Sequence, residues 1–130
     1  RLLYLRTLII TGNFQQFAKA RKLLDNKKKF STFIPFPTIA ADNPKYNPQG
    51  YWRGPIWLDQ TYYGIKGYRN YGEKKKADAY TDQVFRNLQG ISAGTPIYEN
   101  YDTHTGKPMQ ASHFSWSAAC LIMMYNDYGK

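Results

Sequence analysis

The chain has 130 residues, 42% of them hydrophobic, which fits one globular domain or part of one. Its single cysteine excludes an intrachain disulfide bond, and no apolar stretch approaches the roughly 20 residues of a membrane-spanning helix, so no membrane partner is expected. The formal net charge of +9 permits a nucleic-acid partner, but the lysine runs at 27–29 and 74–76 do not alternate with aromatic residues, as a base-stacking surface requires.

The first predicted helix begins near Asn13, after residues 1–12, whose assignment the sequence leaves open. Asn13 and Gln16 have the spacing of a capping box, which satisfies the first backbone N–H groups of a helix. Helical spacing then continues through Phe14, Phe17, Ala18 and Leu24. The run "DNKKK" at 25–29 ends this helix, with cations near its C-terminus.

Prolines dominate the next segment, residues 30–51, which we call the proline-rich arm. Its four prolines exclude a regular helix, because proline lacks the backbone N–H and fixes φ. A second helix is predicted from Gly54 or Pro55 to about Tyr71, since proline is favoured at the first helical position, and Gly72 ends it.

A third helix is predicted from Glu73 to Leu88, with one apolar face formed by Ala77, Tyr80, Val84 and Leu88. Residues 89–115 are predicted to be mostly loop, in which "TPIYENY" gives the best strand signal. The last helix begins at Ser115 as its N-cap and ends at Gly129, with Cys120 as a small buried residue. The sequence therefore predicts an all-α chain with long structured loops, which is part of a larger protein unit.

Aromatic residues make up 17% of the chain, and the segment "GYWRGPIWLDQTYYG" at 50–64 is especially rich in them. Large rings together with a few hydrogen-bonding groups are what a sugar pocket needs. Glycine in this segment permits close approach of the backbone to a ligand. The candidate residues are Tyr51, Trp52, Arg53, Gly54, Trp57, Asp59 and Gln60. The alternative is that both tryptophans belong to the core and that Arg53 caps a helix.

Glu99 is one of two glutamates and lies among Tyr98, Asn100 and Tyr101. A second segment, "HFSWSAA", adds His113 and Trp116 just before the last helix. We interpret His113 and His104 as hydrogen-bonded structural residues, in preference to a chemical role. No group of His, Cys and acidic residues has metal-ligand spacing, and no phosphate-binding glycine loop is present, so neither a metal nor a cofactor is expected.

Three blocks in order, "YWRGPIWLDQTYYGIKGYRNYG", "TPIYENYDTHTGKP" and "HFSWSAACLIMMYND", resemble glycoside hydrolase family 63, and most of all its bacterial α-glucosidase-like members. The upstream "FSTFIPFPTIAADNPKYNPQGYW" is similar to the loop before the first block, and the likeness covers about residues 15–127. Residues 1–12 do not take part in it, and Cys120 stands where histidine is more often expected.

The resemblance implies that residues 1–130 are a C-terminal fragment, about the last third, of one catalytic (α/α)6 barrel. It implies cleavage of α-glucosides or related glycosides with inversion, with Glu99 as general base. The general acid is an aspartate outside this chain, so the isolated fragment is expected to be inactive and to need the remainder of the domain. The binding role falls on Tyr51, Trp52, Arg53 and Trp57, and by their residue types also on Gly54, Asp59, Gln60, Tyr98, Asn100, Tyr101, His113 and Trp116.

Two other functions remain open from the residues themselves. One is a basic, aromatic nucleic-acid-binding module, and the other is a non-catalytic carbohydrate-binding fragment. The residues leave the localisation unknown, whereas the resemblance implies a periplasmic or extracellular protein. On the resemblance, the expected partner is a carbohydrate and not a nucleic acid.

Overall fold

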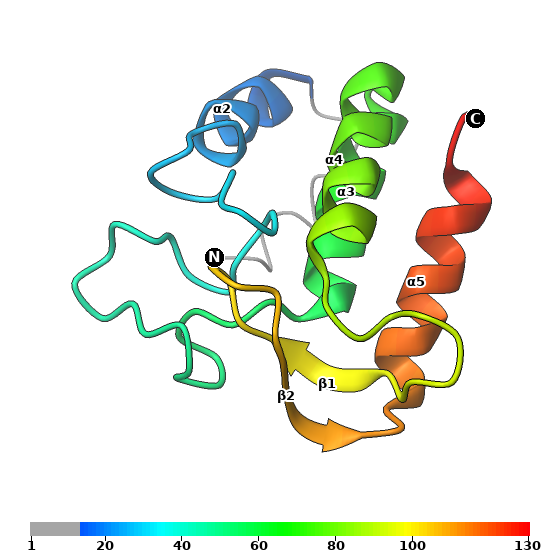
Figure 1. The fold of residues 1–130 in the computed structure, drawn as a ribbon. Coiled ribbons are helices and arrows are strands. Elements are labelled where there is room, and N and C mark those ends of the chain that lie inside the picture. Colours follow the sequence, from blue (N-terminus) through cyan, green and yellow to red (C-terminus); the bar gives the residue numbers. More distant parts are fainter. Residues whose placement is uncertain (1–13) are drawn as a thin grey trace.

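The computed structural model describes residues 14–130, and Figure 1 shows their arrangement. The elements are α2 (Phe14–Leu24), α3 (Leu58–Asn70), α4 (Lys74–Asn87), β1 (Tyr98–Tyr101), β2 (Pro108–Ser112) and α5 (Ser115–Asp127). Residues 1–12 and the predicted cap at Asn13 lie outside the described residues. Within residues 14–130, the helices are too short and too polar for any of them to cross a membrane.

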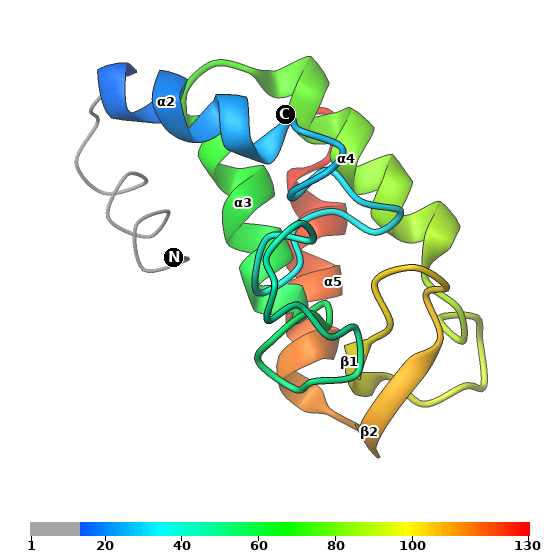
Figure 2. The same ribbon diagram turned by 90° about the vertical axis from the view of Figure 1, so that its left-hand side faces the viewer.

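Helix α3 is central, because it packs against both α4 and α5 (Figures 1 and 2). Helix α2 lies across the end of this layer where α3 finishes, with the Phe17 ring stacked on Tyr71 at 4.3 Å and edge-on to Tyr68 at 5.5 Å. The two-stranded sheet lies at the opposite end, beside the first turn of α5 (Figure 1). The described fold is therefore helix-rich, with four helices and one small sheet.

The predicted helices are all present, but two of their starts differ. Helix α3 begins at Leu58 and not at Gly54 or Pro55, because Ile56 pairs with Tyr101 through two backbone hydrogen bonds of 2.8 and 3.0 Å. This strand-like bridge holds the preceding backbone extended. Helix α5 includes Ser115 as its first residue and has Phe114 as N-cap, so Ser115 as the cap was wrong.

The sheet occupies part of the segment predicted to be loop. Strand β1 is the predicted strand signal, and it pairs antiparallel with β2, with a bulge between Tyr98 and Asn100. Strand β2 was missed, since its sequence "PMQAS" begins with proline and contains no β-branched or aromatic residue. The all-α prediction is thus correct for the four helices and misses one hairpin.

The proline-rich arm has no helix, as predicted, yet it supplies part of the core. Ile34 and Phe36 are fully buried. The Phe36 ring lies 4.8 Å from that of Tyr80 and 6.3 Å from that of Tyr68. A Cβ on Gly64 of α3 would lie 2.5 Å from the Phe36 ring, so the helix needs glycine there to accept the arm. The arm is therefore fixed against α3 and α4.

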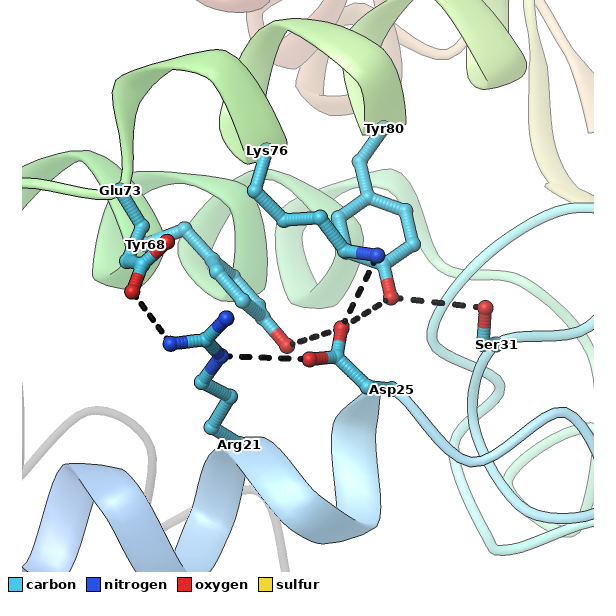
Figure 3. Close-up of polar contacts among 7 residues, drawn as sticks. All are labelled: Arg21, Asp25, Ser31, Tyr68, Glu73, Lys76 and Tyr80. Carbon is cyan, nitrogen blue, oxygen red and sulfur yellow. Dashed lines mark hydrogen bonds and ion pairs between the residues drawn. The ribbon is translucent and has the colours of Figure 1, made fainter.

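A carboxylate, Asp25, ties the end of α2 to α3 and α4 (Figure 3). The Tyr68 and Tyr80 hydroxyls donate to its Oδ1 at 2.9 and 2.7 Å, and Lys76 Nζ lies 3.4 Å from the same atom. Arg21 Nε donates to Oδ2 at 3.3 Å. Burial acts to raise the pKa of Asp25, but the two tyrosine hydroxyls and Lys76 outweigh it and hold that pKa below its ordinary value.

Candidate active site

Glu99 lies within β1 and is half-buried as a residue. The Tyr51 hydroxyl donates to Oε1 at 2.6 Å, whereas the Ala111 N–H reaches Oε2 only at 3.5 Å, the outer limit of a hydrogen bond. The Glu99 backbone carbonyl accepts a hydrogen bond of 3.0 Å from Ser117 Oγ of α5. The hairpin and α5 thus fix the backbone of Glu99, and Tyr51 fixes its carboxylate.

Beside Glu99 lies an aromatic cluster, which we define as Tyr51, Trp52, Trp57, Phe114 and Trp116. Trp57 is its centre, with the Trp52 ring stacked on it at 3.9 Å and the Tyr51 ring edge-on at 5.1 Å. The Trp116 and Phe114 rings lie 6.1 and 6.5 Å from Trp57. Phe114 was not predicted as a site residue, although it precedes the predicted helix start directly. The structure therefore brings the three tryptophans together, and Tyr51 connects this cluster to Glu99.

Exposure divides the cluster into supporting and accessible rings. Trp57 is only 3% exposed, whereas Tyr51, Trp52 and Trp116 are 44%, 46% and 47% exposed. Indole rings that are half open offer apolar faces, which is how proteins stack against flat ligand surfaces. The alternative that both Trp52 and Trp57 are core residues is wrong for Trp52 and correct for Trp57.

Arg53 and Gly54 have different surroundings. Arg53 is exposed, and its guanidinium makes no hydrogen bond or ion pair with the described residues 14–130. A Cβ on Gly54 would lie 2.2 Å from the Asn47 carbonyl oxygen. Glycine is therefore needed at position 54 because the proline-rich arm packs against its backbone. The close approach that the sequence predicted for a ligand is made here by the arm.

Asp59 and Gln60 lie in the first turn of α3. Asp59 is only 3% exposed, and the Gln60 side-chain amide donates to its Oδ2. Burial, followed by the nearby Asp59 charge, raises the pKa of Cys120 to about 11. In this structure Asp59 is thus an interior carboxylate, beneath the surface that a sugar hydroxyl would reach.

The two residues that follow Glu99 on β1 are more buried than Glu99 itself. Asn100 and Tyr101 are fully buried. Neither polar atom of the Asn100 side chain has a hydrogen-bond partner among residues 14–130. The Tyr101 hydroxyl accepts a hydrogen bond from the Tyr98 N–H at 3.1 Å. Contrary to the predicted sugar contacts, Asn100 and Tyr101 lie in the interior, and Tyr98 is half-buried against the core.

Each of the two histidine rings lies within hydrogen-bonding distance of one hydroxyl. His113 is exposed, has a positive φ of 57°, and its Nδ1 lies 3.1 Å from Ser112 Oγ. His104 Nε2 lies 3.1 Å from the Tyr46 hydroxyl in the proline-rich arm. Within residues 14–130 no three His, Cys, Asp or Glu side chains come close enough together to hold a metal ion.

Residues 7–117 match the family model described as the mannosylglycerate hydrolase MGH1-like glycoside hydrolase domain. The chain belongs to glycoside hydrolase family 63. The family resemblance is thereby confirmed, whereas the relatives do not single out its α-glucosidase-like members.

Two relatives illustrate the range of the similarity. A mannosylglycerate hydrolase of Thermus thermophilus is 33% identical over 91 residues, which are 66% of this chain and 20% of that protein. The mannosyl-oligosaccharide glucosidase of Arabidopsis thaliana is 34% identical over 90 residues, which are 60% of this chain and 10% of that protein. The chain thus spans about a fifth or less of these two relatives.

Solved structures have the same fold. The crystal structure of a family 63 mannosylglycerate hydrolase from Thermus thermophilus, in complex with glucose, matches with a TM-score of 0.70 and 23% identity. The match covers 92% of this chain and 29% of that one. The crystallised enzyme in complex with Tris and D-glycerate matches with a TM-score of 0.68 and 23% identity, over 92% of this chain and 28% of that one.

Proposed function

We propose that this chain is the C-terminal part of the catalytic (α/α)6 barrel of an inverting glycoside hydrolase, with Glu99 as its general base. Family membership supports the reaction class. The observation that carries the site is the Glu99 carboxylate, held by Tyr51 at 2.6 Å beside the half-exposed rings of Trp52 and Trp116. A carboxylate next to open aromatic faces is the arrangement that a hydrolase of sugars requires.

In the proposed reaction, Glu99 takes a proton from a water molecule as the water oxygen bonds to the anomeric carbon. The bond to the leaving oxygen breaks on the opposite face, and an acid protonates that oxygen. An inverting enzyme separates the two carboxyl groups by about 6.5–9.5 Å, which leaves room for the water. Trp52 and Trp116 supply the ring faces against which the sugar stacks.

The acid is proposed to come from outside these 130 residues, because the nearest aspartates have other surroundings. Asp59 is buried in the first turn of α3. Asp102 accepts hydrogen bonds from the His104 and Thr105 N–H groups, each at 2.9 Å, and closes a turn. Burial acts to raise the pKa of Asp102, but these N–H donors hold it below the ordinary value, so Asp102 is poorly suited to donate a proton.

The proposed substrates are α-glucosides or related glycosides, and the relatives suggest which to test first. Since several relatives are named mannosylglycerate hydrolases, mannosylglycerate is the first substrate to test. A nitrophenyl α-glucoside is the second, because another relative is a glucosidase. The exposed Arg53 guanidinium has the planar donors that bind a carboxylate or neighbouring hydroxyls.

Glu99→Gln in the complete enzyme tests the proposal. Glutamine keeps the shape but cannot accept the proton, so kcat should fall by about 10²–10⁴-fold with little change in KM. Product release followed by NMR should show inversion at the anomeric carbon in the unaltered enzyme. The matched control is Glu73→Gln, because Glu73 is the other glutamate and forms an ion pair with Arg21 at the surface. Full activity of Glu99→Gln, or retention of configuration, would contradict the proposal.

A further inference from the structure

We propose that Tyr51 is a positioning residue, which holds Glu99 Oε1 so that Oε2 receives the proton from the attacking water. This inference rests on the proposed role of Glu99 as general base. It gives Tyr51 a function beyond that of a ring against which a sugar stacks. Three observations carry the inference. They are the contact of the Tyr51 hydroxyl with Glu99, the constraint on the Tyr51 backbone and ring, and the weak contact to the second carboxylate oxygen of Glu99.

The hydroxyl contact is short and specific. The Tyr51 hydroxyl lies 2.6 Å from Oε1 of Glu99, which is within the distance of a strong O–H···O⁻ hydrogen bond. The hydrogen bond to Glu99, followed by partial desolvation, raises the pKa of Tyr51 above its ordinary value. Tyr51 therefore keeps its proton and remains a donor at neutral pH.

The remainder of Tyr51 is constrained by its neighbours. Its φ of 55° lies in the left-handed region, which a bulky residue occupies only when the surroundings enforce it. The Trp57 indole N–H donates to the Tyr51 carbonyl at 3.0 Å. The Tyr51 ring is edge-on to Trp57 at 5.1 Å and to Trp52 at 5.9 Å. Backbone, carbonyl and ring are thus all held, and the hydroxyl is directed to Glu99.

The two oxygens of Glu99 are not equivalent. Oε1 accepts the Tyr51 hydrogen bond, whereas the only hydrogen bond to Oε2 from residues 14–130 is the one from the Ala111 N–H at 3.5 Å. At that distance the hydrogen bond is weak, so the lone pairs of Oε2 are available to a water. The orientation of a base strongly affects the reaction rate, since a misplacement of about 1 Å can lower that rate by about 10²-fold.

Tyr51→Phe in the complete enzyme removes only the hydroxyl and keeps the ring. With mannosylglycerate as the substrate, kcat should fall by about 10- to 100-fold while KM stays within about twofold. In a Glu99→Gln background, Tyr51→Phe should cause no further loss of kcat, because it acts through Glu99.

The matched control is Tyr46→Phe, which removes another tyrosine hydroxyl of the proline-rich arm, the one beside His104. It should leave kcat and KM unchanged. A rise in KM with kcat unchanged in Tyr51→Phe would show a sugar contact alone and overturn the inference, as would unchanged kinetics. Failure of the proposed function is distinguishable, because Glu99→Gln would then remain active.

Discussion

Two carboxylates of this chain, Asp25 and Glu99, have opposite surroundings. Asp25 receives donors from α2, α3 and α4 on both of its oxygens (Figure 3). Glu99 receives one short hydrogen bond, from Tyr51, and its second oxygen has only a long contact. A carboxylate that receives four donors from three helices holds those helices together, whereas one with an open oxygen is able to accept a proton. The number of donors, and not the residue type, separates the two roles.

The aromatic residues around these carboxylates differ in the same way. Tyr68 and Tyr80 are buried, and their hydroxyls are used to bind Asp25. Trp52 and Trp116 are about half exposed and pack against Trp57, in the cluster from which Tyr51 contacts Glu99. The first region is built on buried tyrosine rings and serves the fold, whereas the second is open at Trp52 and Trp116 and serves the proposed binding of sugar.

The largest expected effect tests whether the open region is sufficient for catalysis. The 130-residue chain assayed by itself should show no measurable turnover of mannosylglycerate or a nitrophenyl α-glucoside, because inversion needs an acid as well as a base. The complete enzyme, assayed in parallel, is the control. Turnover within about tenfold of the complete enzyme, a difference of only about 1.4 kcal/mol in the barrier, would mean that Asp59 or Asp102 supplies the acid.

The second prediction tests whether Asp25 acts on stability alone and Glu99 on catalysis alone. Asp25→Asn should lower the free energy of unfolding by about 1.5–3 kcal/mol, since it weakens hydrogen bonds to a charged acceptor, and should leave kcat unchanged. Glu99→Gln should lower kcat and change stability by less than about 0.5 kcal/mol. Urea unfolding measures the free energy of unfolding of both variants, and steady-state kinetics measure their kcat. A loss of kcat in Asp25→Asn, with the fold intact, would break the comparison.

The third prediction concerns the pH dependence of the Asp25 region. The pKa of Asp25 is below its ordinary value in the folded state, so its contribution to stability is present above the unfolded pKa of about 3.9 and is lost as pH falls through the folded pKa. Burial, the main cause, raises the pKa of Tyr80 to about 12, so its contribution is present below about pH 10 and is lost as pH rises toward 12.

Urea unfolding of the unaltered protein and of Asp25→Asn at several pH values checks the acidic part. The difference between their free energies of unfolding should shrink as pH falls below about 4. For Tyr80→Phe, the difference in free energy of unfolding from the unaltered protein should shrink as pH rises from about 10 toward 12. A difference that stays constant across these ranges would contradict the assignment of the two groups.

The smallest effect concerns binding in the open region. Arg53→Lys should raise KM for mannosylglycerate by about tenfold, because lysine lacks the planar pair of donors, and should leave stability unchanged. Lys45→Arg is a suitable control, since Lys45 is an exposed cation of the proline-rich arm. Equal KM values for Arg53→Lys and the unaltered enzyme would remove Arg53 from the site.

Much of the fold was predictable because helices leave a local pattern. The apolar spacing of Ala77, Tyr80 and Val84 predicted the buried face of α4, and those residues are buried. The start of α3 was not predictable, because Ile56 is held extended by Tyr101, which lies 45 residues away in the sequence. Local preference for proline at a helix start was overridden by that pairing.

The candidate site was predictable as a set of residue types and not as an arrangement. The sequence by itself determined that large rings, an arginine and a lone glutamate occur in three blocks, since residue identity and order are local facts. Only the tertiary structure decided that Trp57 is buried while Trp52 and Trp116 are open, and that Tyr51 contacts Glu99 and the two tyrosines contact Asp25. The reason is physical: exposure and hydrogen bonding across 43 to 55 residues depend on how distant elements pack, which no local pattern records.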